Sequence, residues 1–194
     1  VRENDDEAMR CFRILADNVK DSTFVAKAYV EMGSISRNQS QFNDALGYYK
    51  AVVEDMPMSG CSDDALAAIE SIYQTRNEPE EFLKYIESIG KGASKSEGEK
   101  EKMIFNAAEQ NYLSGSYQKA LASLQAYLDK YPAGKFANNA EFYIADSYRQ
   151  LGKYEQACDS YEKVIAGGTG SFVELAMLNF SDLSYKLERW EDAF

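Results

Sequence analysis

Small, aromatic and bulky apolar residues alternate with polar ones along the chain at spacings typical of one helix face. Four segments align on an alanine, at Ala45, Ala120, Ala157 and Ala193. An aromatic residue stands three positions earlier, and in the complete copies a bulky residue follows four positions later and another apolar residue three beyond. These residues are Phe42, Tyr117, Tyr154 and Trp190, then Tyr49, Leu124 and Tyr161, then Val52, Tyr127 and Val164. Because steps of three and four keep side chains on one stripe, each segment is predicted to be a helix.

A second amphipathic stretch precedes each of these segments, at 26–37, 64–75, 101–115, 139–152 and 174–187. A small residue lies twelve positions before the alanine, at Gly33, Ala108, Ala145 and Ser181. Short polar turns such as 38–41 and 114–116 join the two stretches. We therefore expect helical hairpins whose two helices cross closely at the small residues.

The alanine recurs with a nearly fixed period. Ala8, Ala45, Phe82, Ala120, Ala157 and Ala193 are separated by 37, 37, 38, 37 and 36 residues, with Phe82 in the place of one alanine. A period in this range indicates stacked copies of one unit rather than a domain with a single centre. We expect the stack to bend or loosen at Phe82, where a ring replaces a methyl group.

The residues around the small positions resemble the tetratricopeptide repeat family. Its signature places an aromatic residue, a Leu-Gly pair and a tyrosine on the first helix, then alanine, an aromatic residue, alanine and proline on the second. The copies here match it at Tyr29, Met32-Gly33, Ala45, Tyr49 and Pro57, at Ala107-Ala108, Ala120 and Pro132, and at Ile144-Ala145, Tyr148, Gly152, Ala157 and Tyr161. The copy around 63–100 is degenerate and keeps Tyr73 and Ile86.

This resemblance implies an all-α, right-handed superhelix, a solenoid of about four full hairpins with a partial repeat at each end. The whole chain, 1–194, is then one array. Its predicted parts are the second helix of a truncated repeat (5–20), full repeats at 26–62, 101–137 and 138–173, a degenerate repeat at 63–100, and a truncated repeat at 174–194. Because both ends fall inside a repeat, we expect the chain to be a fragment of a longer array.

The segment 131–157 is similar to a sub-group of these repeats common in bacterial cell-envelope proteins, with a Tyr-Pro, a small-residue turn, and Ala137 and Ala140. It favours a bacterial periplasm or cell envelope, with the cytoplasm as the alternative. The stretch 90–102, rich in Gly, Ser and charge, is expected to be a solvated connector rather than a docking loop. Ser94 or Ser96 is available there to cap the next helix.

Composition argues against most chemistry. The chain has no histidine, which removes the commonest general base and metal ligand, and its three cysteines show no zinc spacing. The net charge of −11 disfavours a nucleic-acid partner, since phosphate contacts need clustered Lys and Arg. No apolar run is long enough to span a membrane. We expect neither an enzyme nor a cofactor or metal site.

First helices line the inner surface of the superhelix in the family, so their inward positions are the candidate binding residues. These positions are Phe105, Glu109 and Tyr112, then Phe142, Asp146 and Arg149, then Leu178, Asp182 and Tyr185. Glu109, Asp146 and Asp182 share one repeat position and form an acidic row, beside an apolar row of Phe105, Phe142 and Leu178. The alternative is that the acids are merely solvated and the apolar row packs on the adjoining helix.

These observations favour a non-catalytic scaffold that binds a peptide or protein segment, carrying basic residues, in the concave groove. One alternative is a structural spacer, because apolar residues at the ends such as Phe12, Leu15, Trp190 and Phe194 predict end-to-end self-association. Another is an accessory helical region of a larger multidomain protein.

Overall fold

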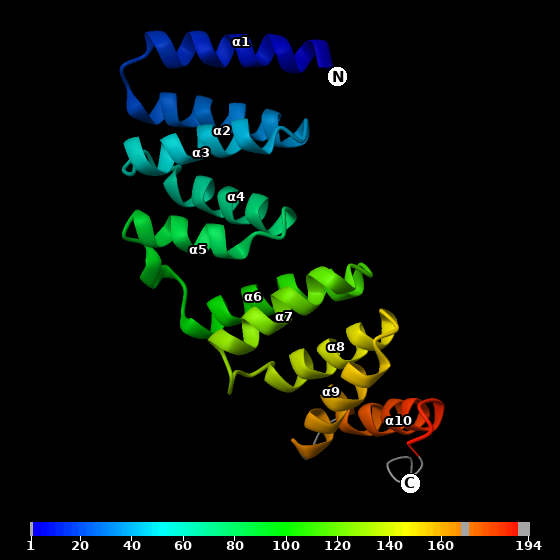
Figure 1. The fold of residues 1–194 in the computed structure, drawn as a ribbon. Helices are drawn as coiled ribbons and strands as arrows, with labels where there is room; N and C mark the ends of the chain where they lie inside the picture. Colours follow the sequence, from blue (N-terminus) through cyan, green and yellow to red (C-terminus); the bar gives the residue numbers. More distant parts are fainter. Residues whose placement is uncertain (1, 168–170, 190–194) are drawn as a thin grey trace. The chain divides into compact units, whose positions relative to one another are not determined.

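The structure, a computed structural model, describes residues 2–167 and 171–189, and these are almost entirely helical (Figure 1). Along the chain the elements are α1 (Arg2–Asn18), α2 (Ser22–Asn38), α3 (Phe42–Asp55), α4 (Ser62–Thr75), α5 (Pro79–Ser88), the short 3-10 helix η1 (Gly92–Ser94), α6 (Glu97–Leu113), α7 (Tyr117–Lys130), α8 (Ala137–Gln150), α9 (Tyr154–Ala166) and α10 (Ser171–Lys186). The predicted all-α fold is confirmed.

The helices divide into two compact units, one ending at Ser94 and the other beginning at Lys95. In the first unit α2 packs on α3 and α4 on α5, and in the second α6 packs on α7 and α8 on α9. The predicted helical hairpins are therefore confirmed. In the second unit α8 also contacts both α6 and α10, so these three first helices form one layer, called here the first-helix layer. The second helices α7 and α9 pack against it.

One turn geometry recurs after every first helix. Ser40, Asn77, Gly115, Gly152 and Glu188 all have φ from 57° to 73°, in the left-handed region, and each lies five residues before the recurring alanine position of its repeat, which Phe82 occupies in one copy. The next residue in each turn donates its N–H to a carbonyl five positions back, as in Gln41 to Ser36 at 2.8 Å and Arg189 to Ser184 at 2.9 Å. This is the Schellman ending of a helix. Its regular spacing shows in the backbone the same repeat that the alanines show in sequence.

The small residues have the steric role that their pattern predicts. Ala45, Ala120 and Ala157 are completely buried where the helices of each hairpin meet. A Cβ atom added to Gly33 on α2 would lie 2.7 Å from two ring carbons of Tyr49 on α3, well inside contact distance. Ala8 on α1 is only partly buried. Trp190 and Ala193 lie outside the described residues.

The hairpin that carries Phe82 differs from its neighbours. Its second helix, α5, has 10 residues where α3 and α7 have 14, and α4 and α5 approach each other over a shorter length than the helices of the other hairpins. The Phe82 ring is buried, with its centroid 6.4 Å from that of Tyr73 on α4. The ring is thus packed inside this hairpin where the other hairpins have a methyl group, and the expectation that the stack bends or loosens here stays a prediction.

The connector after α5 is shorter than predicted. Gly92–Ser94 form a single 3-10 turn, and α6 begins at Glu97, so residues 97–102 are helical. Ser96 is the cap: its Oγ accepts a hydrogen bond from the N–H of Glu99, whose carboxylate accepts one from the N–H of Ser96 at 2.8 Å. This reciprocal capping box satisfies two N–H groups that a helix start leaves unpaired.

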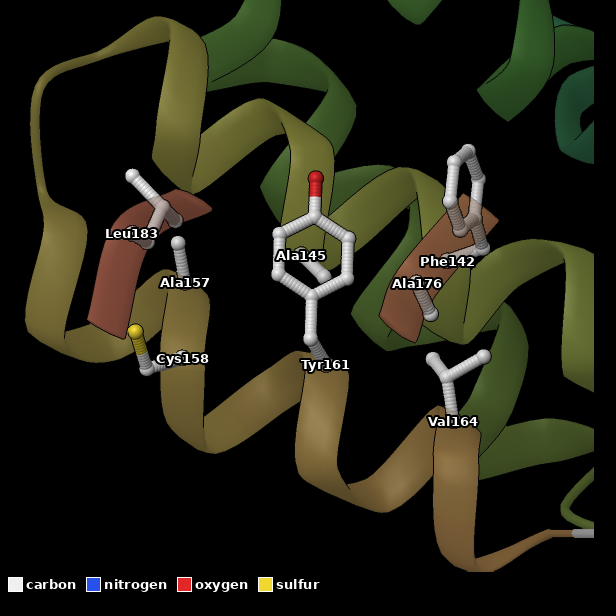
Figure 2. Close-up of a cluster of buried hydrophobic side chains, with 8 residues drawn as sticks. All are labelled: Phe142, Ala145, Ala157, Cys158, Tyr161, Val164, Ala176 and Leu183. Carbon is white, nitrogen blue, oxygen red and sulfur yellow. The ribbon is translucent and has the colours of Figure 1, made fainter. Parts of the chain in front are cut away.

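The core of the second unit lies between the two helix layers. Figure 2 shows Tyr161 and Val164 on α9 directed toward Ala145 and Phe142 on α8 and Ala176 on α10, and Cys158 on α9 directed toward Leu183 on α10. Each of these side chains is less than 7% exposed. Burial raises the pKa of the Cys158 thiol above its ordinary value, so this cysteine serves as apolar filling.

Candidate protein-interaction surface

The nine residues predicted to bind a partner all lie on the first-helix layer of the second unit. The helix α6 carries Phe105, Glu109 and Tyr112, α8 carries Phe142, Asp146 and Arg149, and α10 carries Leu178, Asp182 and Tyr185. They share a layer, but they differ greatly in exposure. Three of them are buried, and two of the three on α10 are large apolar or aromatic side chains open to solvent.

The apolar row is mostly interior. Phe105 and Phe142 are 2% and 6% exposed, whereas Leu178 is 68% exposed. An aromatic residue at the start of the following first helix covers each buried member. The ring of Phe105 stacks on that of Phe136 with centroids 4.6 Å apart, and that of Phe142 lies 4.7 Å from that of Phe172. These two phenylalanines therefore join neighbouring hairpins and present little surface to a partner.

Asp146 is a buried carboxylate with a full set of hydrogen-bond donors. It is 3% exposed and accepts hydrogen bonds from Tyr161 at 3.0 Å, Tyr112 at 2.9 Å and Gln150 at 3.2 Å. Arg149 adds an ion pair, with its Nη2 at 2.6 Å from Oδ1. Burial opposes ionisation, but the donors, Arg149 foremost, outweigh it and hold the pKa of Asp146 below its ordinary value. Asp146 thus connects α6, α8 and α9 from the inside.

The other two acids of the row are more accessible. Glu109 is partly buried and accepts a hydrogen bond from the Tyr143 hydroxyl through Oε1 at 2.9 Å. Asp182 is exposed and pairs with Lys186 one turn later at 3.3 Å. The three carboxylates at this repeat position thus differ: Glu109 is hydrogen-bonded between helices, Asp146 is buried, and Asp182 is at the surface. The prediction that this row binds basic residues stays a prediction, and Glu109 and Asp182 are the members that a partner can reach.

Two tyrosine–carboxylate hydrogen bonds join α6 to α8. Tyr112 on α6 donates to Asp146, and Tyr143 on α8 donates to Glu109 in the opposite direction. The Tyr112 and Tyr143 rings stack with centroids 4.5 Å apart. Burial, followed by the hydrogen bond to Glu109, raises the pKa of Tyr143 to about 12. Both hydroxyls therefore stay protonated and able to donate at neutral pH, which fixes these two helices side by side.

Sequence reasoning missed several residues of this surface. Tyr143 follows Phe142 directly and so falls beside the projected inward positions, although its ring stacks on Tyr112 and its hydroxyl donates to Glu109. Tyr161 and Asn179 were missed as well: Asn179 donates to the Tyr161 hydroxyl at 3.1 Å and extends the Asp146 network to α10. The available signal was the spacing of 34 residues between each tyrosine and its acid, which is close to the repeat period.

Two grooves lie elsewhere, each where a second helix meets the following hairpin. In the first unit a groove of about 550 Å³ is lined by α3, α4 and the start of α5. Lys50 reaches across it, donating to the Tyr73 hydroxyl at 3.2 Å and lying 4.5 Å from the ring centroid of Tyr85. In the second unit a groove of about 330 Å³ runs between α7, α8 and α9 and includes Tyr148 and Lys163. Both have mixed polar and apolar linings.

Among the described residues, no cluster of His, Cys, Asp or Glu has the arrangement that a metal ion needs. Within the same ranges, no helix is both long enough and apolar enough to cross a membrane. The three cysteines are free, with Cys11 exposed, Cys61 partly buried and Cys158 buried.

Comparison with known proteins supports the repeat. Residues 139–166, which cover most of the α8–α9 hairpin, match the family model of the tetratricopeptide repeat. No curated protein matches the chain. A crystal structure of nearly identical TPR-like repeats, ascribed to a kinesin light chain of Podospora anserina, aligns with 90% of this chain and 92% of its own at 12% identity and a TM-score of 0.40. The resemblance is confirmed for this hairpin, and such repeats are typically non-catalytic protein-interaction modules.

Proposed function

We propose that this protein is a non-catalytic interaction scaffold, and that the first-helix layer of its second unit binds a polypeptide segment bearing Lys or Arg. The match of residues 139–166 to a repeat that generally mediates protein interactions supports the general function. The particular surface rests on one observation. The α6–α8 contact is fixed internally by tyrosine–carboxylate hydrogen bonds, while Glu109, Asp182 and Tyr185 remain accessible along the layer.

In this proposal the buried and accessible residues have different roles. Asp146 holds the Arg149 guanidinium in one orientation, at 2.8 Å from Nε, and the Arg149 side chain is 35% exposed. Arg149 can therefore donate its remaining N–H groups to a backbone carbonyl of the partner. Glu109 offers its Oε2 to a Lys or Arg. Because these groups are already fixed, binding costs the scaffold little conformational entropy.

A peptide screen with matched variants tests the proposal. An array of 15-residue peptides of varied charge would be probed with the purified chain, and Lys- or Arg-containing peptides should be retained over acidic ones. The double variant Glu109→Gln, Asp182→Asn should bind a selected peptide roughly 2- to 30-fold more weakly at low salt, since each accessible charge pair contributes about 0.2–1 kcal/mol. The affinity of the double variant should also depend less on salt.

Asp159→Asn is the control, because Asp159 is an exposed acid on the second helix α9. It lowers the net negative charge without touching the first-helix layer, so peptide binding should be unchanged. Equal affinity and salt dependence of the double variant and the wild type would contradict the proposed surface. Retention of acidic rather than basic peptides would contradict the proposed partner chemistry.

A further inference from the structure

A repeated aromatic contact joins each hairpin of the second unit to the next. Each first helix has an apolar residue three positions before its small residue. An aromatic residue of the next first helix, nine positions before the small residue of that helix, covers it. Phe105 is covered by Phe136, and Phe142 by Phe172. The covered rings are 2% and 6% exposed, so each contact completes burial at a hairpin–hairpin interface.

The two halves of this contact also occur uncovered, at opposite ends of the described residues. Leu178 on α10 is at the position of Phe105 and Phe142, three before Ser181, and is 68% exposed. Phe24 on α2 is at the position of Phe136 and Phe172, nine before Gly33, and is 53% exposed. Lys27 lies 5.9 Å above the Phe24 ring, much as Lys135 lies 5.8 Å above Phe136. The exposed pair therefore has the repeat register of the buried pairs, with a leucine in place of one of the two rings.

We propose that Phe24 of one copy packs on Leu178 of a second copy, so that α2 continues the first-helix layer beyond α10 and copies of this chain associate head to tail. The residue that covers the α10 face then has the same repeat position as Phe136 and Phe172, which make this contact inside the chain. Leu175 and Met177, about half exposed on α10, enlarge the apolar area available to it. The interface is heterologous, because the α2 face of one copy meets the α10 face of another. Each assembly therefore still has one open α2 face and one open α10 face, to which further copies can bind.

The repeat register also identifies the polar neighbours of this contact. Tyr185 takes the position of Tyr112, and Ser34, which contacts the Tyr49 hydroxyl in its own copy, takes that of Asp146, so these two polar side chains would lie near each other across the interface. Glu31 and Asp182 take the positions of Tyr143 and Glu109, so two carboxylates face each other across the interface. Since each copy also carries a net charge of −11, association should strengthen with added salt.

Sedimentation velocity of the chain tests the proposal, over a concentration series at about 0.1 M and about 0.5 M salt. The wild type should form dimers and larger species, more so at the higher salt. Phe24→Asp and Leu178→Asp should each weaken association by about tenfold or more, as for a buried apolar contact. Glu31→Lys should strengthen it. Met58→Asp is the control, because Met58 is 94% exposed in the turn between α3 and α4 and belongs to neither α2 nor α10.

Mixing the two weakened variants gives the sharpest result. Phe24→Asp keeps an intact α10 face and Leu178→Asp keeps an intact α2 face, so the mixture should yield a one-to-one dimer and nothing larger. A symmetric dimer through α10 would leave Phe24→Asp fully associated, and that result would overturn the proposal. A wild-type chain that stays monomeric at both salt concentrations, or a mixture without dimers, would also overturn it. Both substitutions are at exposed sites, so both variants should fold. Far-UV circular dichroism checks this.

A deletion separates this interface from competition by the chain itself. Residues 190–194 align in the repeat with residues 5–9 of α1, which accompanies α2. In the head-to-tail contact, residues 5–9 of the second copy would thus carry the repeat positions that 190–194 carry in the sequence of the first. Removing 190–194 should leave head-to-tail association equal or stronger, and loss of association in the deleted chain would refute the proposal. The single variant Glu109→Gln, which leaves Asp182 and the rest of α10 unchanged, measures peptide binding separately, so either result stands without the other.

Discussion

Removing the Asp146 carboxylate should be among the most destabilising single changes in the second unit. Asp146→Ala leaves the hydroxyls of Tyr112 and Tyr161 and the amide of Gln150 without their shared acceptor. Each buried donor left unpaired costs about 1 kcal/mol or more. The Tyr161 hydroxyl keeps the hydrogen bond from Asn179, and Arg149, about a third exposed, recovers hydration. The expected total is about 3 kcal/mol, at the lower limit for breaking a buried ion pair.

Asp146→Asn should cost less, about 1–2 kcal/mol, because it keeps one acceptor oxygen and the shape of the side chain. Urea unfolding followed by far-UV circular dichroism gives the free energies, and hydrogen exchange in α6, α8 and α9 locates the effect. Asp129→Ala is the control, because Asp129 is an exposed acid on α7 that accepts a hydrogen bond from Gln125, and it should change stability by less than about 0.5 kcal/mol. A loss below about 1 kcal/mol for Asp146→Ala would refute the view that this carboxylate connects the helices.

The pH dependence gives an independent check. The pKa of Asp146 in the folded chain lies below its ordinary value, about 4 in the unfolded chain. The unfolded chain therefore binds the proton first as the pH falls, and folding loses the contribution of the ionised network. The stability difference between the wild type and Asp146→Asn should be constant above about pH 5 and shrink as the pH falls from about 4 through the lower folded-state pKa. A difference that is the same at all pH values would contradict the ionised network.

Two further predictions concern single backbone positions and use the same unfolding measurement. Gly33→Ala should destabilise the chain by about 1–3 kcal/mol, because the added methyl group would overlap the buried Tyr49 ring, which Ser34 also contacts at 3.1 Å. Gly47→Ala is its matched control: Gly47 is inside α3 with nothing within 4 Å of an added Cβ, so the gain in helix propensity should stabilise the chain by about 0.5–1 kcal/mol. Equal effects of the two substitutions would contradict the steric account of the small residues. Ser40→Gly should stabilise the chain by up to about 1 kcal/mol, because φ is 61° there and other repeats have glycine at this position. A loss of stability would show that the serine side chain contributes more than the backbone strain costs.

The hairpins could be predicted from sequence because two local signals coincide in each copy. The small residues mark where helices cross, and their spacing from the alanine is constant at Gly33, Ala108 and Ala145. The turn residues give a second signal, but only Gly115 and Gly152 are recognisable as left-handed positions from sequence. Ser40 and Glu188 adopt the same conformation because the Schellman hydrogen bonds hold them there. The backbone repeat is thus more regular than the sequence repeat.

The exposure of the candidate binding residues could not be predicted in the same way. A repeat position fixes which helix face a side chain leaves from, whereas its burial depends on what the next hairpin places over it. Phe142 is buried because Phe172 lies over it, and Leu178, at the same position, is exposed. Those covering residues come from the beginning of the next repeat, about 30 residues later, so one copy of the repeat read by itself does not show them.

The acidic row illustrates the same physical point for charge. Glu109, Asp146 and Asp182 occupy one repeat position, yet only Asp146 is surrounded by donors from three helices, because Tyr112 reaches it from the preceding first helix and Tyr161 from its own second helix. Glu109 has one such donor, and Asp182 pairs within its own helix. A carboxylate at this position is therefore interior wherever both neighbouring tyrosines are present, and available to a partner wherever they are missing. On this reasoning, Tyr112→Phe with Tyr161→Phe should raise the pKa of Asp146 while Arg149 keeps it ionised at neutral pH, a shift that carbon-detected NMR titration of the carboxylate would measure.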